Sequence, residues 1–154
     1  MANGTVLGIY IAPIAGAPME EVDTVWAVEG RGLDGDRYGS AVGSFNRGAP
    51  GKRQVTLING LFFEGSGFEY GESRRNIITL GVELMDLIGK EFDVGYARLR
   101  GVKYCDPCLR PSVLARKKIA FRDAFHDRGG LVAEVIKSGR IETSSMIVPP
   151  RKDY

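Results

Sequence analysis

Two cysteines, Cys105 and Cys108, are the side chains of this sequence best suited to covalent or metal chemistry. They stand in a Cys-Asp-Pro-Cys segment between a predicted strand and a predicted helix that Ser112 can cap. A helix N-terminus and a nearby cation, here Arg110, both favour the thiolate over the thiol. A thiolate is a nucleophile and a soft metal ligand. We therefore predict that Cys108, the thiol closer to the helix, carries the chemistry.

Other interpretations of the two cysteines stay open. Free cysteines are commonly buried and structural, and the spacing also suits a redox dithiol, although the βαβ unit expected around such a motif is not evident. Zinc is less favoured, because a tetrahedral site needs four ligands and the chain has a single histidine, His126. That lone histidine and the lack of a Gly-x-Ser-x-Gly segment also disfavour a serine hydrolase.

Arginine could provide an anion-binding surface near the thiol. The sequence has 14 Arg and 7 Lys, and the guanidinium group binds phosphate and carboxylate through two parallel hydrogen bonds. Arg74 and Asn76 precede a predicted strand, so we expect them on one face, able to bind a phosphate and a heterocycle edge. Arg37 is expected to face a pocket, with Asp36 orienting it. The alternatives are an ordinary turn and a solvated edge paired with Glu72.

Short strands joined by glycine turns are expected to position these groups, because the sequence holds 21 Gly and many short β-branched and aromatic runs. The expected strands are 5–11, 22–28, 53–58, 75–80 and 92–99, the last with a bulge at Gly95, followed by a closing hairpin of 131–136 and 141–148. The segment 29–52, with seven Gly, is expected to form a long loop that lines part of the site.

Helical segments are expected to interrupt the strands at three places. Two are short and cover residues 60–64, capped by Asn59, and 82–88. The third is an amphipathic helix that starts near Ser112 and ends before the glycines at 129–130. Its apolar side is formed by Leu114, Phe121 and Phe125.

Length and composition predict one folded domain over residues 1–154. Hydrophobic residues make up 44% and charged residues 26%, as in soluble globular proteins. A formal charge of +2 predicts no nucleic-acid partner, and the sequence has neither a signal peptide nor the run of about 20 apolar residues that spans a membrane. We expect a cytoplasmic protein that is mostly β: a β-barrel with a few peripheral short helices.

Six segments, in order, resemble the MOSC (molybdenum cofactor sulfurase C-terminal) domain family in its stand-alone bacterial form. They are residues 32–37, 53–58, 73–77, 87–89, 105–108 and 128–131. The resemblance implies a β-barrel with a pocket for the molybdenum cofactor, molybdopterin. The family's invariant cysteine falls on Cys108, as molybdenum ligand or sulfur carrier. Arg74, Arg75 and Asn76 match the segment that holds the pterin, and Arg37 would add a further positive charge.

Three functions are compatible with these residues. The first is a molybdenum-dependent protein that reduces N-hydroxylated compounds or performs other oxygen-atom or sulfur chemistry at a Cys108-bound metal. The second is a non-catalytic carrier of the cofactor, or of sulfur as a Cys108 persulfide. The third is a dithiol redox protein that uses Cys105 and Cys108. The expected partners are a small-molecule cofactor or substrate and a protein that donates sulfur or electrons.

Overall fold

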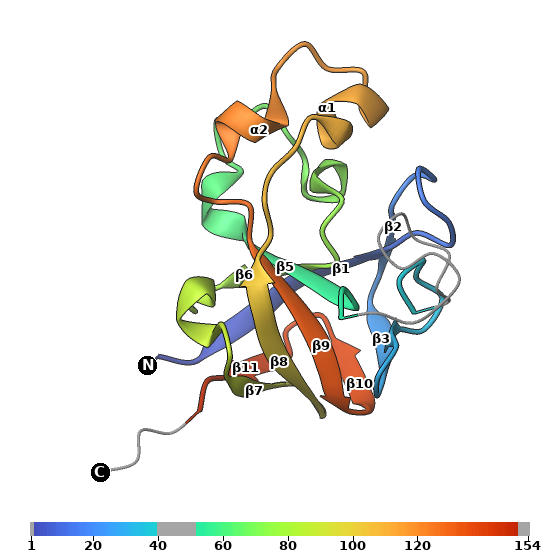
Figure 1. The fold of residues 1–154 in the computed structure, drawn as a ribbon, viewed down its shortest axis with the longest axis vertical. Coiled ribbons are helices and arrows are strands. Elements are labelled where there is room, and N and C mark those ends of the chain that lie inside the picture. Colours follow the sequence, from blue (N-terminus) through green and yellow to red (C-terminus); the bar gives the residue numbers. More distant parts are fainter. Residues whose placement is uncertain (1, 40–51, 151–154) are drawn as a thin grey trace.

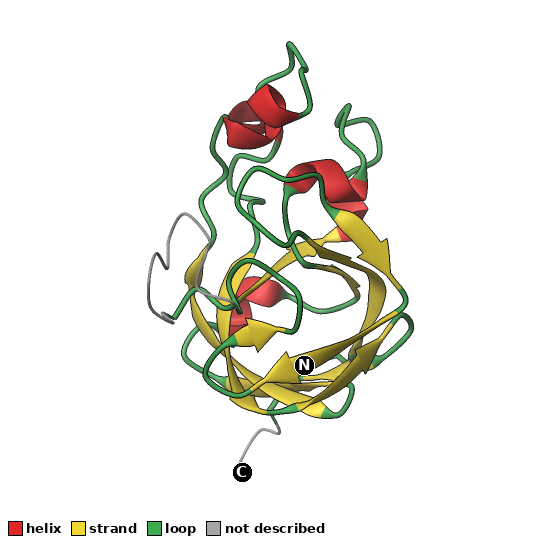
Figure 2. Ribbon diagram, turned by 90° about the vertical axis from the view of Figure 1, so that its right-hand side faces the viewer, coloured by secondary structure: helices red, strands yellow, loops and turns green. Residues whose placement is uncertain are grey.

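The computed structural model describes residues 2–39 and 52–150, and these residues form a closed barrel of seven strands (Figure 1). The order around the barrel is β11-β7-β8-β9-β5-β6-β1, and pairing of β11 with β1 closes it (Figure 2). The strands are β1 (Gly4–Ile11), β5 (Val55–Asn59), β6 (Ile77–Leu80), β7 (Glu91–Val94), β8 (Ala97–Tyr104), β9 (Leu131–Lys137) and β11 (Met146–Val148). The mostly β fold class and the barrel predicted from the sequence are confirmed.

A three-stranded sheet lies beside the barrel and contains β10 (Gly139–Glu142), β3 (Thr24–Val28) and β4 (Gly32–Leu33). The predicted closing hairpin is therefore wrong: β10 pairs with β3 and not with β9, while β11 pairs with β7 and β1. After β9 the chain passes from the barrel to the three-stranded sheet. Gly139 permits this, because a Cβ there would lie 2.2 Å from the Tyr96 carbonyl oxygen. Only a glycine lets the chain pass so close to the turn between β7 and β8.

Two hydrophobic clusters cover the two faces of β5 and β6, the parallel pair of the barrel. Leu57 and Ile77 belong to the cluster inside the barrel. Ile58 and Ile78 point the other way and pack against an aromatic cluster that includes Phe121. Burial on both faces explains why these strands are almost continuously apolar in sequence. The aromatic cluster fastens the helical segments to the outside of the barrel.

The predicted long helix is two short ones, α1 (Arg110–Leu114) and α2 (Phe121–Ala124), above the barrel in Figure 1. Ser112 explains the break, because its hydroxyl donates to the Ile119 carbonyl at 2.7 Å and accepts from the Phe121 amide at 2.7 Å. Its side chain thus holds the start of α2 and does not cap α1. Phe121 is buried as predicted, but Leu114 is 38% exposed.

The remaining differences concern short elements. The predicted helices at 60–64 and 82–88 are single 3₁₀ turns, η1 (Gly60–Phe62) and η3 (Leu84–Leu87), and Asn59 caps η1 as expected. A further 3₁₀ turn, η2 (Tyr70–Ser73), precedes β6. Gly95, with φ of 58°, lies in the tight turn between β7 and β8 and not in a bulge. The predicted strand 22–28 divides into β2 (Glu20–Val22) and β3.

The loop predicted at 29–52 lies partly outside the described residues. Its described part contains β4, where the sequence predicted only loop, and the residues after β4 turn back towards β1. Among the described helices, none is long and apolar enough to span a membrane.

Candidate functional site

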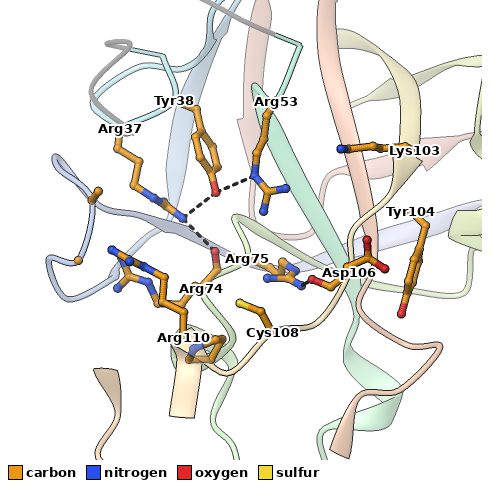
Figure 3. Close-up of a pocket in the computed structure, with 13 residues that line it drawn as sticks. Arg37, Tyr38, Arg53, Arg74, Arg75, Lys103, Tyr104, Asp106, Cys108 and Arg110 are labelled. Carbon is orange, nitrogen blue, oxygen red and sulfur yellow. Dashed lines mark hydrogen bonds between the residues drawn. The ribbon is translucent and has the colours of Figure 1, made fainter. Parts of the chain in front are cut away.

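A pocket of about 220 Å³ brings Cys108 together with a group of cationic side chains (Figure 3). Among the described residues that line it, six are Arg or Lys and one is Asp. The charged residues are Arg37, Arg53, Arg74, Arg75, Lys103, Arg110 and Asp106. Such an excess of positive charge around a concave surface favours an anionic ligand.

Arg37 is held by the carboxylate of Asp36, as the sequence predicted. The Asp36 side chain is fully buried, and its Oδ1 accepts from Arg37 Nη1 at 3.0 Å and from the Ala12 amide at 3.0 Å. Arg37 Nη2 also donates to the carbonyl oxygen of Arg74 at 3.2 Å. The guanidinium group is therefore oriented before any ligand binds.

Tyr38 lies between two of the cations. Its hydroxyl oxygen accepts a hydrogen bond from Arg37 Nη2 at 3.1 Å and another from Arg53 Nε at 3.2 Å. Arg53 also donates through Nη2 to the sulfur of Cys105 at 3.5 Å. A chain of polar contacts thus joins the segment after β4 to the start of β5 and the end of β8.

Arg74 follows η2 and adopts the left-handed conformation, with φ of 66°. Its guanidinium group donates to the Ala17 carbonyl in the segment between β1 and β2. Burial, together with the nearby charges of Arg37 and Arg110, lowers the pKa of Arg74 to about 10. The side chain is therefore still charged at neutral pH, at an electrostatic cost that a bound anion would reduce.

Arg75 fixes the segment that carries the cysteines. Its Nε donates to the Gly129 carbonyl at 2.8 Å, Nη2 to the Asp106 carbonyl at 3.4 Å and Nη1 to the Ser73 carbonyl at 3.3 Å. A single buried guanidinium group therefore links three backbone segments around the pocket.

The two thiols have different surroundings. Cys105 is only 1% exposed and accepts the hydrogen bond from Arg53, whereas Cys108 is exposed and lines the pocket (Figure 3). Both are free thiols. The helix after Cys108 is one turn long, so its dipole contributes less than the sequence suggested.

A comparison with known families matches residues 54–148 to the MOSC domain. The chain belongs to the MOSC domain family. This family is associated with molybdenum cofactor binding or sulfur-related chemistry. The matched range includes Arg74, Arg75 and both cysteines, while Arg37 and Tyr38 precede it. No curated protein sequence matches the chain.

Solved structures share the fold of this MOSC domain at low sequence identity. The YuaD protein of Bacillus subtilis superposes with a TM-score of 0.78 at 18% identity, over 95% of this chain and 94% of that one. YiiM of Geobacillus stearothermophilus gives 0.70 at 14% identity, over 96% and 75% of the two chains. YiiM of Escherichia coli gives 0.63 at 15% identity, over 97% and 71%.

Four of the five predicted site residues of this MOSC domain line one pocket. These are Arg37, Arg74, Arg75 and Cys108. Asn76 is different, because its Oδ1 accepts from the Thr56 amide at 3.0 Å and its Nδ2 donates to the Tyr10 carbonyl at 3.0 Å. It joins three barrel strands and does not line the pocket. The face expected to carry both Arg74 and Asn76 does not form, because the left-handed Arg74 breaks the alternation.

Sequence reasoning missed several residues of the pocket wall. Arg53 and Lys103 lie at or near the ends of barrel strands that were predicted, but nothing in their spacing showed which way they point. Tyr38 directly follows Arg37 in the sequence, and that adjacency was the one available signal.

Proposed function

We propose that this MOSC domain binds the molybdenum cofactor in the pocket, with the Cys108 thiolate as the protein ligand to molybdenum. One observation carries the proposal: an exposed thiol and six cationic side chains line the same concave site. A soft thiolate suits molybdenum, and guanidinium groups suit the phosphate of a pterin cofactor. The thiolate and the guanidinium groups of the pocket therefore fit the metal and the phosphate of the cofactor.

Different residues of the chain would bind the cofactor and position its ligand. Arg37 and Arg74 would hold the anionic group, since hydrogen bonds within the protein orient both. Arg75 would position Cys108 through its bond to the Asp106 carbonyl, and Asn76 would act indirectly by fixing the start of β6. When bound, the cofactor would supply two-electron oxygen-atom or sulfur chemistry.

The size of the pocket limits how the ligand is held. About 220 Å³ is less than the roughly 300–1,000 Å³ of sites that enclose a drug-sized ligand. We therefore infer that the pocket encloses only part of the cofactor. This would leave the reacting face accessible to a substrate such as an N-hydroxylated compound, or to a donor protein.

A second candidate function is transport of sulfur as a Cys108 persulfide. Exposure of Cys108 favours it, because a sulfur donor or acceptor must reach the thiol directly. A redox dithiol finds less support, since Cys105 is buried against Arg53 while Cys108 faces the pocket.

The proposal is tested by the molybdenum and pterin content of protein purified from a host that makes the cofactor. We expect stoichiometric metal in the parent and its loss in Cys108→Ala, because the thiolate bond to the metal is removed. Arg122→Gln, on the exposed surface of α2, is the matched control and should retain the metal. A parent that carries neither molybdenum nor pterin would contradict cofactor binding and favour the persulfide function.

A further inference from the structure

The hydroxyl of Tyr38 is a buried polar group in the wall of the pocket. Tyr38 is 3% exposed, and its oxygen accepts from Arg37 Nη2 and Arg53 Nε. Guanidinium groups carry donors and no acceptor. The tyrosine oxygen must therefore be the acceptor in both bonds.

The hydrogen of this hydroxyl is left without an acceptor in the part of the chain that the structure describes. In both of its hydrogen bonds to the arginines the oxygen is the acceptor. Leaving a buried donor unpaired is costly, so this hydroxyl is available to an acceptor that enters the pocket. Figure 3 shows the hydroxyl between the two guanidinium groups, at the edge of the space that Cys108 also faces.

The surroundings hold the hydroxyl in place and strengthen it as a donor. Arg37 is fixed by Asp36 at 3.0 Å, and Arg53 by the Cys105 sulfur at 3.5 Å. The guanidinium carbon of Arg37 lies 4.3 Å from the centre of the Tyr38 ring. Two cations that donate to the oxygen withdraw electron density from it, and this polarises the O–H bond.

We propose that Tyr38 donates a hydrogen bond to an anionic oxygen of the ligand in this pocket. This assigns an oxyanion contact to the wall formed by Arg37, Tyr38 and Arg53. The inference builds on the proposed function, because it adds a contact in the same pocket, but it needs neither molybdenum nor Cys108. The oxygen could belong to a phosphate group or to a metal oxoanion, which share this chemistry.

The test is calorimetric titration of the metal-free protein with orthophosphate and, separately, with molybdate. Tyr38→Phe keeps the ring against Arg37 and removes only the hydroxyl. We expect about tenfold weaker binding in this variant, as for the loss of a hydrogen bond to a charged group. An effect on orthophosphate alone identifies a phosphate contact, and an effect on molybdate alone identifies an oxometal contact. Equal affinities of parent and variant for both anions, or no binding by the parent, overturn the inference.

Controls separate donation from a structural role. Tyr96→Phe removes the hydroxyl of a residue that is 69% exposed on the turn between β7 and β8, and it should leave binding unchanged. Replacing Tyr38 by 3-fluorotyrosine makes the hydroxyl a stronger donor and a weaker acceptor. At a pH that keeps this phenol protonated, donation to the ligand predicts tighter binding. Weaker or unchanged binding would show that Tyr38 acts only as an acceptor for the two arginines.

The same titration on Cys108→Ala keeps the two proposals apart. The Tyr38 contact predicts that Tyr38→Phe weakens orthophosphate binding by the same factor in the Cys108→Ala background as in the parent, because the thiol is not part of the contact. Failure of the parent to hold molybdenum would then leave the Tyr38 result intact, and an unaffected Tyr38→Phe variant would leave the Cys108 ligand proposal intact.

Discussion

At the scale of single residues, the pocket is characterised by positive charges that the protein holds close together. Holding these charges together costs electrostatic free energy. Arg74 shows this, because burial and the charges of Arg37 and Arg110 lower its pKa to about 10. A base whose pKa is lower in the folded state binds its proton less tightly there than in the unfolded chain. The cost is therefore fully present at neutral pH and would be relieved only as the pH rises past about 10.

This cost predicts how the protein responds to anions. At pH 7, orthophosphate should raise the melting temperature of the parent, because a bound anion offsets the repulsion and stabilises only the folded state. Arg74→Gln should show a smaller rise, with phosphate affinity about tenfold weaker. Differential scanning fluorimetry over a phosphate series measures both effects. Arg122→Gln should respond as the parent does, and an identical response of Arg74→Gln would show that Arg74 does not face the anion.

The sequence predicted which residues come together at the pocket better than it predicted where each side chain points. Cys108, Arg37 and Arg74 line one pocket as expected. Their residue types alone had indicated a thiolate and an anion-binding group. Asn76 was misplaced because strand alternation was extended to Arg74, whose φ of 66° takes it out of the strand. Neither the residue type nor the spacing of the polar residues indicates a left-handed backbone at this position.

At the scale of elements, α1 and α2 show where a periodic pattern fails. Leu114, Phe121 and Phe125 have helical spacing, which predicted one helix. Arg116, with φ of 55°, lies just after α1, and the chain forms a second turn at Phe121. The aromatic cluster outside the barrel buries both Phe121 and Phe125 in this arrangement.

Ser112 is expected to stabilise this pair of helices. In Ser112→Ala, the buried Phe121 amide and the Ile119 carbonyl would each lose a partner at 2.7 Å. We expect the free energy of unfolding to fall by about 2–3 kcal/mol, measured by urea denaturation. Ser138→Ala, which removes the hydroxyl that accepts a solvent-exposed hydrogen bond from the Glu29 amide, should cost less than about 1 kcal/mol. Equal losses in the two variants would contradict the role given to Ser112.

At the scale of the whole molecule, a closed sheet could be predicted but its connections could not. Many short apolar runs separated by glycine turns indicate a barrel, since closure removes exposed strand edges. The path of β10 depends on a contact between Gly139 and Tyr96, 43 residues apart in the sequence. Local turn signals at 137–140 favoured a hairpin, and only the tertiary contact excludes it.

The order of the strands in the barrel is also what assembles the pocket. Arg53 precedes β5, Arg74 and Arg75 precede β6, and Cys108 follows β8. These segments are distant in sequence and become neighbours because β9 pairs with both β5 and β8, while β5 pairs with β6. The Arg75 bonds to the Gly129 and Asp106 carbonyls then fix the cysteine segment against the barrel.

The most direct test of the Cys108 proposal is X-ray absorption at the molybdenum edge, on parent and Cys108→Ser protein loaded with the cofactor. We predict one protein sulfur in the first coordination shell of molybdenum in the parent, replaced by oxygen or lost in Cys108→Ser. The same number of sulfur ligands in both proteins would show that Cys108 does not bind the metal.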